Sequence, residues 1–167
     1  NNLFKNRVLK MTINEGTLYQ ARHDWGLGIL KISEAYENSG IDKAKIVANE
    51  FLENLYGFEF GPILFKPTLS GGSTTFRPSK EGALSYFIAG NPDYPNDTGF
   101  GLKNWRKIES DTSAIFIEQN VAMWIGWVTF INNNGDEVKV DKSWGYRIND
   151  EGSLKIVLHH SSLPYEK

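Results

Sequence analysis

The chain has 167 residues, of which 40% are hydrophobic and 13% aromatic, a composition that excludes an intrinsically disordered chain. The 18 Lys and Arg nearly balance the 20 Asp and Glu, so the net charge of −2 gives no electrostatic basis for binding nucleic acid or an anionic membrane. No apolar run is long enough to predict a membrane span. Because cysteine is absent, disulfides, cysteine-ligated zinc and thiol nucleophiles are excluded.

The length predicts one domain over residues 1–167. The chain begins at Asn1 rather than at methionine, which fits either a mature form or a piece of a longer polypeptide. Residues 1–13 have no hydrophobic period and predict an irregular lead-in.

A long helix is predicted over residues 15–39, ending at Gly40, because apolar residues recur at spacings of three, four or seven. These residues, expected on one face, are Leu18, Trp25, Ile29, Ile32 and Tyr36. His23 lies in this segment beside Asp24 and is expected to be exposed rather than part of a site.

A second helix is predicted over residues 42–56, with Asp42 as its N-cap. Its expected apolar side consists of Ile46, Val47, Phe51, Leu52 and Leu55. Short strands are predicted at residues 63–65 and 75–77, and Pro78 with Ser79 opens a third helix that runs to Ala89 and carries Tyr86.

The second half of the chain predicts a sheet, with strands at 102–108, 114–118, 121–131 and 137–148 and a final strand from Leu154. Both faces of the 121–131 strand are largely apolar, so one face is expected to pack on helices and the other in a subunit contact. The order of the elements predicts an α+β fold, in which N-terminal helices pack on a curved, mostly antiparallel sheet that encloses a cavity.

The final strand ends in His159, His160, Ser161 and Ser162, which place two imidazoles and two hydroxyls side by side. Neighbouring side chains on a strand point to opposite faces, so only one of the two histidines can face the cavity. Simple alternation with Leu154, Ile156 and Leu158 would bury His160 and Ser162. A bend at the strand end would instead bury His159 and Ser161, and the residues leave both arrangements open.

A catalytic zinc site is not predicted, because a site with three histidine ligands would require His159 and His160 together with His23. Glycine-rich phosphate loops and a Gly-x-Ser-x-Gly nucleophile elbow are also missing. The chemistry that the chain does offer is a site of hydroxyls and imidazole. Its candidate hydroxyls belong to Thr68, to Tyr86, and to Ser161 or Ser162. Thr68 directly follows Pro67.

Three runs carry a resemblance to a known family: residues 64–68 (Leu-Phe-Lys-Pro-Thr), 76–87 (Phe-Arg-Pro-Ser-Lys-Glu-Gly-Ala-Leu-Ser-Tyr-Phe) and 158–164 (Leu-His-His-Ser-Ser-Leu-Pro). Together they resemble the iota-class carbonic anhydrases. That family belongs to the NTF2-like superfamily and is related to the association domain of calcium/calmodulin-dependent kinase II. The resemblance covers about residues 57–165.

The resemblance implies a cone-shaped cavity, a homodimer, and reversible hydration of carbon dioxide to bicarbonate. Thr68, Tyr86 and Ser161 would hold bicarbonate and the attacking water, with His159, His160 and Ser162 as further substrate-binding candidates. Some family members work without a metal and others have been assigned zinc or manganese; ligand counting in this chain favours no metal. Relatives occur in bacteria and in algal plastids, so the resemblance does not fix a compartment.

Two alternatives stay open at this level. Cavity-bearing domains of this shape also serve as oligomerisation or small-ligand-binding modules, which would show assembly without turnover. A small hydrolase or isomerase that uses the histidine would show turnover on other substrates.

Overall fold

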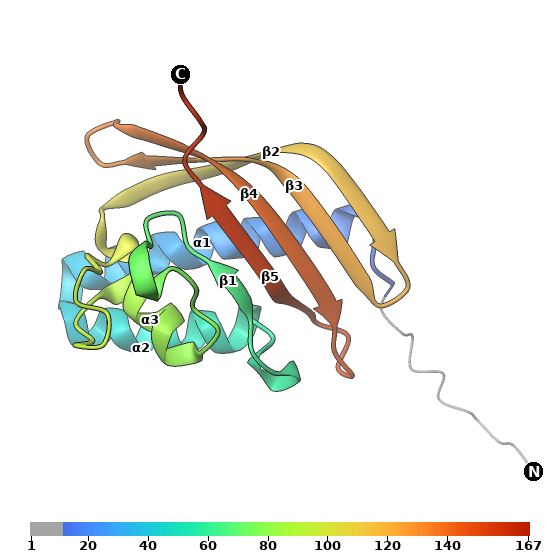
Figure 1. Cartoon of the computed structure of the whole chain (residues 1–167), viewed down its shortest axis with the longest axis horizontal. Coiled ribbons are helices and arrows are strands. Elements are labelled where there is room, and N and C mark those ends of the chain that lie inside the picture. The colour runs from blue at the N-terminus through green and yellow to red at the C-terminus, as the bar shows by residue number, and fades with distance from the viewer. Residues whose placement is uncertain (1–11) are drawn as a thin grey trace, which may run out of the picture.

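The structure is a computed structural model that describes residues 12–167 (Figure 1). Most of the predicted lead-in therefore lies outside the described residues, and Thr12 and Ile13 precede the first helix without regular structure. No described helix is both long and apolar enough to cross a membrane.

Three helices form one layer: α1 (Glu15–Ser39), α2 (Ile41–Leu55) and α3 (Lys80–Ile88). A capping box starts α1, since Asn14 Oδ1 accepts from the Thr17 backbone N–H at 2.9 Å and Thr17 Oγ1 accepts from the Asn14 N–H at 3.0 Å. Gly40 ends α1 with a φ of 81°, a conformation that favours glycine. The predicted bounds of this helix are confirmed.

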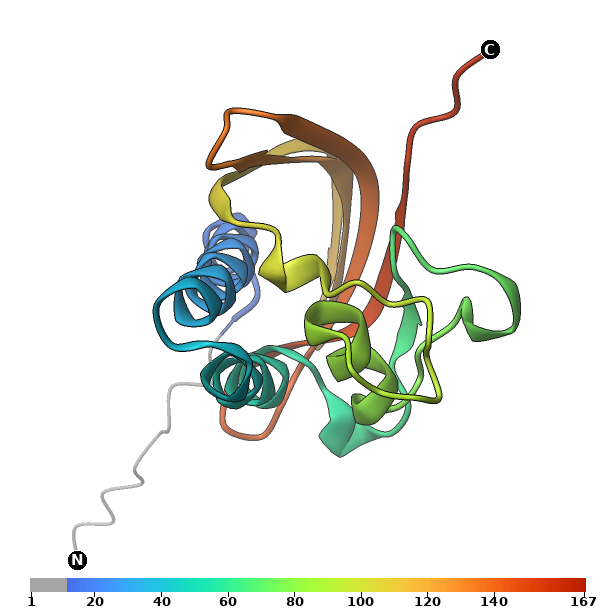
Figure 2. The same cartoon turned by 90° about the vertical axis from the view of Figure 1, so that its left-hand side faces the viewer.

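Five strands form the second layer: β1 (Leu64–Lys66), β2 (Trp105–Glu118), β3 (Val121–Asn132), β4 (Glu137–Ile148) and β5 (Leu154–Ser162). Their order is β1-β5-β4-β3-β2, antiparallel throughout except for the parallel pair β1 and β5. The sheet curves around the helices without closing, and all three helices lie on its concave side (Figure 2). The predicted mostly antiparallel α+β architecture is confirmed.

The core lies between the two layers and is rich in aromatic rings. Trp25 of α1 packs against Phe130 and Trp144 of the sheet, with ring centroids 5.9 and 5.1 Å apart. Gly28 allows α1 and α2 to approach closely, because a Cβ at this position would collide with the ring of Phe51.

Several local predictions were wrong. Asp42 does not cap α2; the N-cap is Gly40, and Asp42 lies in the first turn. Tyr36 and Ile46, expected on buried faces, are 40% and 52% exposed. Residues 75–77 form no strand: the Arg77 N–H donates to the Phe65 carbonyl of β1 at 2.8 Å, but side-chain hydrogen bonds of Ser70 and Arg77 hold the rest of the segment as a loop. The two strands predicted at 102–108 and 114–118 are one strand, β2, with register shifts inside it.

A bulge in β5 decides which side chains of the last strand face the helices. Ile156 pairs with Tyr146 and Leu158 pairs with Gly145, so Val157 is an extra residue with no partner in β4. The extra residue reverses the alternation after it. As a result Ile156 and His159, three positions apart, are both buried, and simple alternation gave the wrong inner set.

Candidate active site

Three hydroxyls from separate parts of the chain meet at one point inside the sheet. Thr68 follows β1 and Ser161 lies near the end of β5; because these two strands run parallel, their carboxyl ends lie side by side. Thr68 Oγ1 and Ser161 Oγ are 2.6 Å apart, a strong hydrogen bond in which either can donate. Tyr86 of α3 lines the same cavity as Thr68; burial raises the pKa of its phenol to about 12, and the nearby Leu69 and Thr68 offset this rise only in part.

His159 lies on the same face of β5 as Ser161 and is buried. Its imidazole stacks on Phe65 with ring centroids 4.5 Å apart. Nδ1 is 2.8 Å from Tyr56 Oη, and Nε2 is 2.9 Å from Lys142 Nζ. Burial, together with the nearby Lys142, lowers the pKa of His159 well below its ordinary value, so the ring is neutral near pH 7.

Lys142 was missed by the sequence analysis. It lies on β4 and is only 5% exposed, with Nζ 4.9 Å from the Trp25 ring and 5.5 Å from the Trp144 ring. Burial lowers the pKa of its amine to about 7. The available signal was its place in an alternating inner row of β4, in which Val140, Trp144 and Tyr146 are the other members.

These groups line a small, tightly packed cavity, and the about 180 Å³ of empty space between their side chains is too narrow for a water molecule. Its lining is aromatic apart from a few polar groups: Trp25, Phe65, Pro67, Thr68, Tyr86, Phe87, Phe100, Lys142 and His159. A larger groove, with about 1100 Å³ of empty space, opens between α1 and strands β2–β4, but no predicted hydroxyl lines it. The lining of the small cavity, aromatic rings with a few polar groups, suits the chemistry of a small molecule that is apolar in one form and polar in another.

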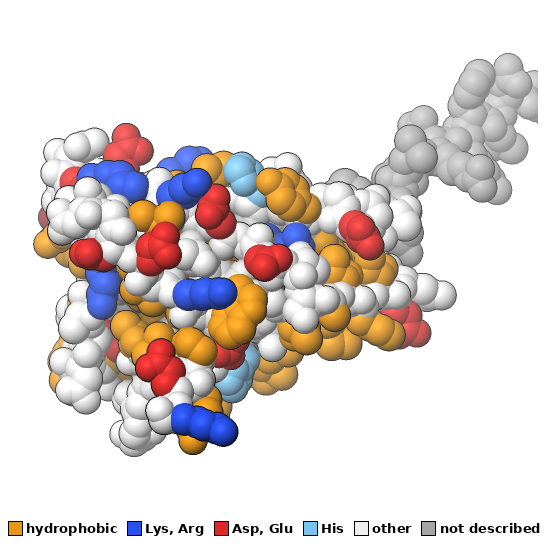
Figure 3. All heavy atoms as spheres, turned by 90° about the horizontal axis from the view of Figure 1, so that it is seen from above, with side chains coloured by type: hydrophobic (Ala, Val, Ile, Leu, Met, Phe, Trp, Pro, Cys, Tyr) orange, Lys and Arg blue, Asp and Glu red, His pale blue; other side chains and the backbone are white. Residues whose placement is uncertain are grey.

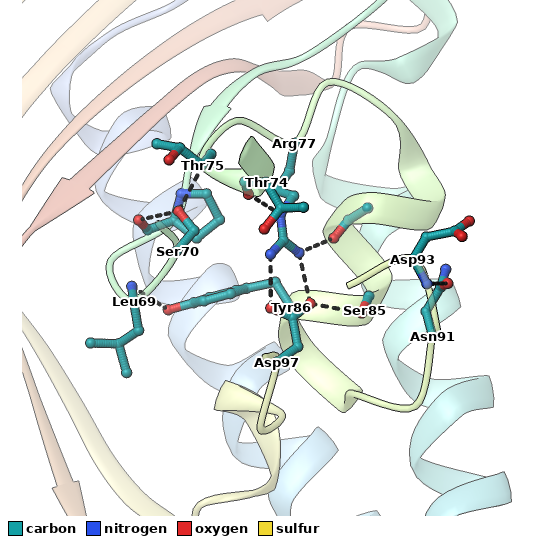
Figure 4. A network of polar contacts seen from close by, with 12 residues as sticks. Leu69, Ser70, Thr74, Thr75, Arg77, Ser85, Tyr86, Asn91, Asp93 and Asp97 are labelled. Carbon is teal, nitrogen blue, oxygen red and sulfur yellow. Dashed lines mark hydrogen bonds and ion pairs between the residues drawn. The ribbon is translucent and has the colours of Figure 1, made fainter. Parts of the chain in front are cut away.

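A second polar network holds the loop after Thr68 against α3 (Figure 4). The guanidinium of buried Arg77 donates to both carboxylate oxygens of Asp97, each at 2.7 Å, and Ser85 Oγ donates to the same carboxylate at 2.7 Å. Ser70 Oγ donates to the Thr75 carbonyl at 2.7 Å and closes the loop on itself. This network fixes the start of the loop, where the Leu69 N–H donates to Tyr86 Oη at 3.4 Å.

The model of a family described as metal-independent carbonic anhydrase matches residues 16–163. A metal-independent carbonic anhydrase from Nostoc sp. is 40% identical over 163 residues, which are 98% of this chain and 80% of that protein. This chain belongs to the metal-independent carbonic anhydrase family.

Solved structures agree with that assignment. The crystal structure of an iota-carbonic anhydrase from a cyanobacterium, complexed with bicarbonate, matches with a TM-score of 0.94 and 40% identity over 98% of this chain and 99% of that one. A protein of the NTF2-like family from Streptomyces avermitilis matches with a TM-score of 0.57 at 11% identity, over 90% of this chain and 96% of that one. The latter likeness concerns the fold alone, and it confirms the predicted NTF2-like architecture.

The metal-independent description of the family agrees with the ligand counting from sequence. Within residues 12–167, no three His, Asp or Glu side chains lie together as metal ligands would. The polar groups around the carbonic anhydrase cavity are hydroxyls, an amine and one imidazole, a set poor in the carboxylates and multiple imidazoles that hold catalytic zinc or manganese.

The remaining site candidates from sequence lie elsewhere. His160 is exposed on the opposite face of β5. Ser162 is also on that face, and its Oγ donates to Asp141 Oδ1 at 2.6 Å. His23 is exposed on α1 and stacks on Tyr19, as expected for a residue outside the site. The structure therefore brings together Thr68, Tyr86, His159 and Ser161 but not His160 or Ser162.

Proposed function

We propose that this carbonic anhydrase performs the reversible hydration of carbon dioxide in the small aromatic cavity, with Thr68, Tyr86 and Ser161 as the hydroxyls that hold bicarbonate and the attacking water. The observation that carries the proposal is the connected set of hydroxyls beside buried His159. The three hydroxyls come from the loop after β1, from α3 and from β5, yet Thr68 and Tyr86 line one largely aromatic cavity and Ser161, 93 positions from Thr68 in the chain, hydrogen-bonds to Thr68. The bicarbonate bound by the cyanobacterial relative supports this substrate for the present chain.

The cavity suits both forms of the substrate. Carbon dioxide is apolar, and the faces of Phe65, Phe87 and Phe100 offer an apolar surface. As water attacks the carbon, negative charge grows on the carbon dioxide oxygens, and hydroxyl donors aimed at them stabilise the transition state in the way an oxyanion hole does. In the Thr68–Ser161 pair one hydroxyl donates to the other, which leaves one of the two hydrogens for this purpose.

Tyr86 and His159 have distinct roles in this scheme. With a pKa of about 12, the phenol of Tyr86 keeps its proton near neutral pH and acts as a hydrogen-bond donor. The depressed pKa of His159 makes it a weak base, so it orients its neighbours rather than storing a proton.

The test is stopped-flow hydration of carbon dioxide by protein dialysed against a strong chelator, with metal content measured by mass spectrometry. Activity above buffer at substoichiometric metal is expected. Loss of activity that one added metal restores would overturn the metal-free mechanism. Retained assembly with no turnover under any condition would favour a non-catalytic binding module.

We further propose that the chain forms a homodimer through the outer face of β3. Three apolar side chains on that face, Val121, Met123 and Ile125, are 36% to 48% exposed, and Phe116 on β2 adds to them at 54%. Seen from above, hydrophobic side chains gather towards the β2–β3 end while charged ones are spread over the rest (Figure 3). Light scattering should give twice the chain mass, and Ile125→Asp should give a monomer; a monomeric wild type would overturn this proposal.

A further inference from the structure

We propose that the amine of Lys142 is the group that accepts the proton lost by the attacking water, and that returns a proton when bicarbonate is dehydrated. This inference rests on the function proposed above and adds the base that its hydroxyls do not supply.

The position of Lys142 puts its side chain at the reaction site. Lys142 on β4 is the direct cross-strand partner of Ser161 on β5, so both side chains leave the sheet on the inner face. Lys142 lines the same small cavity as Thr68 and Tyr86. A base must lie within hydrogen-bond reach of the water that it deprotonates, directly or through one further water.

A hydrogen-bond chain fixes the protonation of this amine. The indole N–H of Trp25 can only donate, and it donates to Tyr56 Oη at 3.0 Å. The phenol hydrogen of Tyr56 is then directed to His159 Nδ1, 2.8 Å away. A neutral imidazole whose Nδ1 accepts carries its proton on Nε2, which faces Lys142 Nζ at 2.9 Å.

That last contact requires a lone pair on Nζ, because an ammonium group would present a hydrogen to the Nε2–H of His159. The opposite tautomer, with the proton on Nδ1, would point the imidazole N–H at Tyr56 Oη and leave the phenol hydrogen of Tyr56 without an acceptor in the chain. The chain from Trp25 to Lys142 is therefore complete only when the amine is neutral. A neutral amine is a base.

The charged groups around Lys142 agree with this state. Within residues 12–167, no carboxylate oxygen lies within 4.0 Å of Nζ. Asp141, the next residue, favours the charged form but is outweighed by burial, and Lys66 on β1 opposes that form. The rings of Trp25, Phe130 and Trp144 surround the rest of the amine. The resulting pKa of about 7 allows the amine to take and release protons near neutral pH.

The other titratable groups of the cavity are poor acceptors. His159 titrates well below its ordinary pKa, and burial raises the pKa of the Tyr56 and Tyr86 phenols. In hydration, rotation about the Cε–Nζ bond turns the lone pair of Lys142 to the water. The water oxygen then bonds to carbon, one C=O pair moves to oxygen, and the water proton passes to Nζ. The products are bicarbonate and an ammonium that faces the His159 N–H, which favours passing the proton on to solvent.

The test compares Lys142→Met with Lys139→Met by stopped flow between pH 6 and 9. Lys139 lies on the same strand, is exposed, and serves as the matched control. Lys142→Met should lower kcat for hydration by about 100-fold or more, the usual size of a general-base contribution, and should remove the rise of kcat/KM around pH 7. Lys139→Met should keep both the rate and the rise. Small exogenous amines should partly restore Lys142→Ala.

A rate for Lys142→Met within about threefold of wild type, or an unchanged pH profile, would overturn the inference while the proposed function stands. An inactive wild type would remove both together. If Lys142→Met fails to fold, NMR titration of the Lys142 side chain in wild-type protein decides instead. A side chain that stays charged at pH 9, or that forms a carbamate with ¹³C-labelled carbon dioxide in place of titrating, contradicts the proposal.

Discussion

Two buried basic residues, Arg77 and Lys142, have opposite surroundings. Arg77 is 1% exposed and meets the carboxylate of Asp97 in a bidentate ion pair at 2.7 Å. Lys142 is 5% exposed and meets rings and an imidazole instead. Guanidinium cannot deprotonate in a protein, so Arg77 stays charged beside Asp97, whereas an amine can lose its proton. The first residue therefore stabilises a loop and the second is available for proton transfer.

The largest effect should come from breaking the Arg77–Asp97 pair. Asp97→Ala leaves a buried guanidinium without a counter-ion and should lower the free energy of unfolding by about 3 to 5 kcal/mol. Denaturation with urea measures the change. Asp93→Ala in the same exposed loop is the matched control and should change stability by no more than about 0.5 kcal/mol. A small effect of Asp97→Ala would mean that the ion pair does not hold the loop.

Replacing Lys142 should raise the free energy of unfolding, the opposite of the change expected for Asp97→Ala. Burial of Lys142 moves its pKa from 10.5 to about 7, which corresponds to a cost of up to about 5 kcal/mol at neutral pH. Lys142→Met removes that cost but leaves the His159 Nε2–H without an acceptor, worth about 1 to 3 kcal/mol. We expect a net gain in stability of about 2 kcal/mol at pH 7, again by urea denaturation.

The pH dependence of that gain checks its cause. The folded protein loses the Lys142 proton at a lower pH than the unfolded chain, so the unfolded state binds more protons between about pH 7 and 10.5. Wild-type stability should therefore rise through this window relative to Lys142→Met, and the advantage of the variant should shrink. A gain that is constant from pH 7 to 10 would point to packing rather than charge.

The hydroxyl cluster should give a smaller free-energy effect that is confined to activity. Thr68→Ala and Tyr86→Phe should each lower kcat at least about tenfold, which is about 1.4 kcal/mol of transition-state stabilisation. Thr68→Ser keeps the hydroxyl and should retain most of the rate. Circular dichroism should show intact folds. Wild-type rates in both variants would remove the cluster from the mechanism.

The smallest effect is expected on the outer face of β5. His160→Ala alters an exposed imidazole next to the site residues in sequence, and it should change kcat by less than about twofold and stability by no more than about 0.5 kcal/mol. His159→Ala, one position earlier, removes the link between Tyr56 and Lys142 and should lower kcat strongly. Equal effects of the two variants would contradict the inner and outer assignment.

Local chemistry was sufficient to predict much of the fold. The apolar period that ends at Gly40 predicts the whole of α1, and Ser79 caps α3 as its sequence position suggests, accepting from the Gly82 N–H at 3.1 Å. The bounds of β4 follow from turn residues on both sides of it. These features depend on residues within a few positions of one another, which is why sequence alone identifies them.

Only part of the candidate site could be predicted from the sequence. Thr68, Tyr86 and Ser161 were found through the three runs shared with the family rather than through any local period. Lys142 lies in none of those runs, so resemblance did not point to it. A lysine in an otherwise buried row of a strand was the remaining signal, and it gains meaning only beside His159 and Trp25.

The sequence by itself determined the three helices, strands β1, β3, β4 and β5, and the presence of two imidazole and hydroxyl pairs at the end of β5. Only the tertiary structure decided which pair faces the cavity. One unpaired residue, Val157, reverses the side-chain alternation, and the local sequence of the strand does not predict this bulge. The protonation of Lys142 was likewise decided by tertiary structure. An amine changes its pKa through the groups that surround it, and these come from α1, β3, β4 and β5.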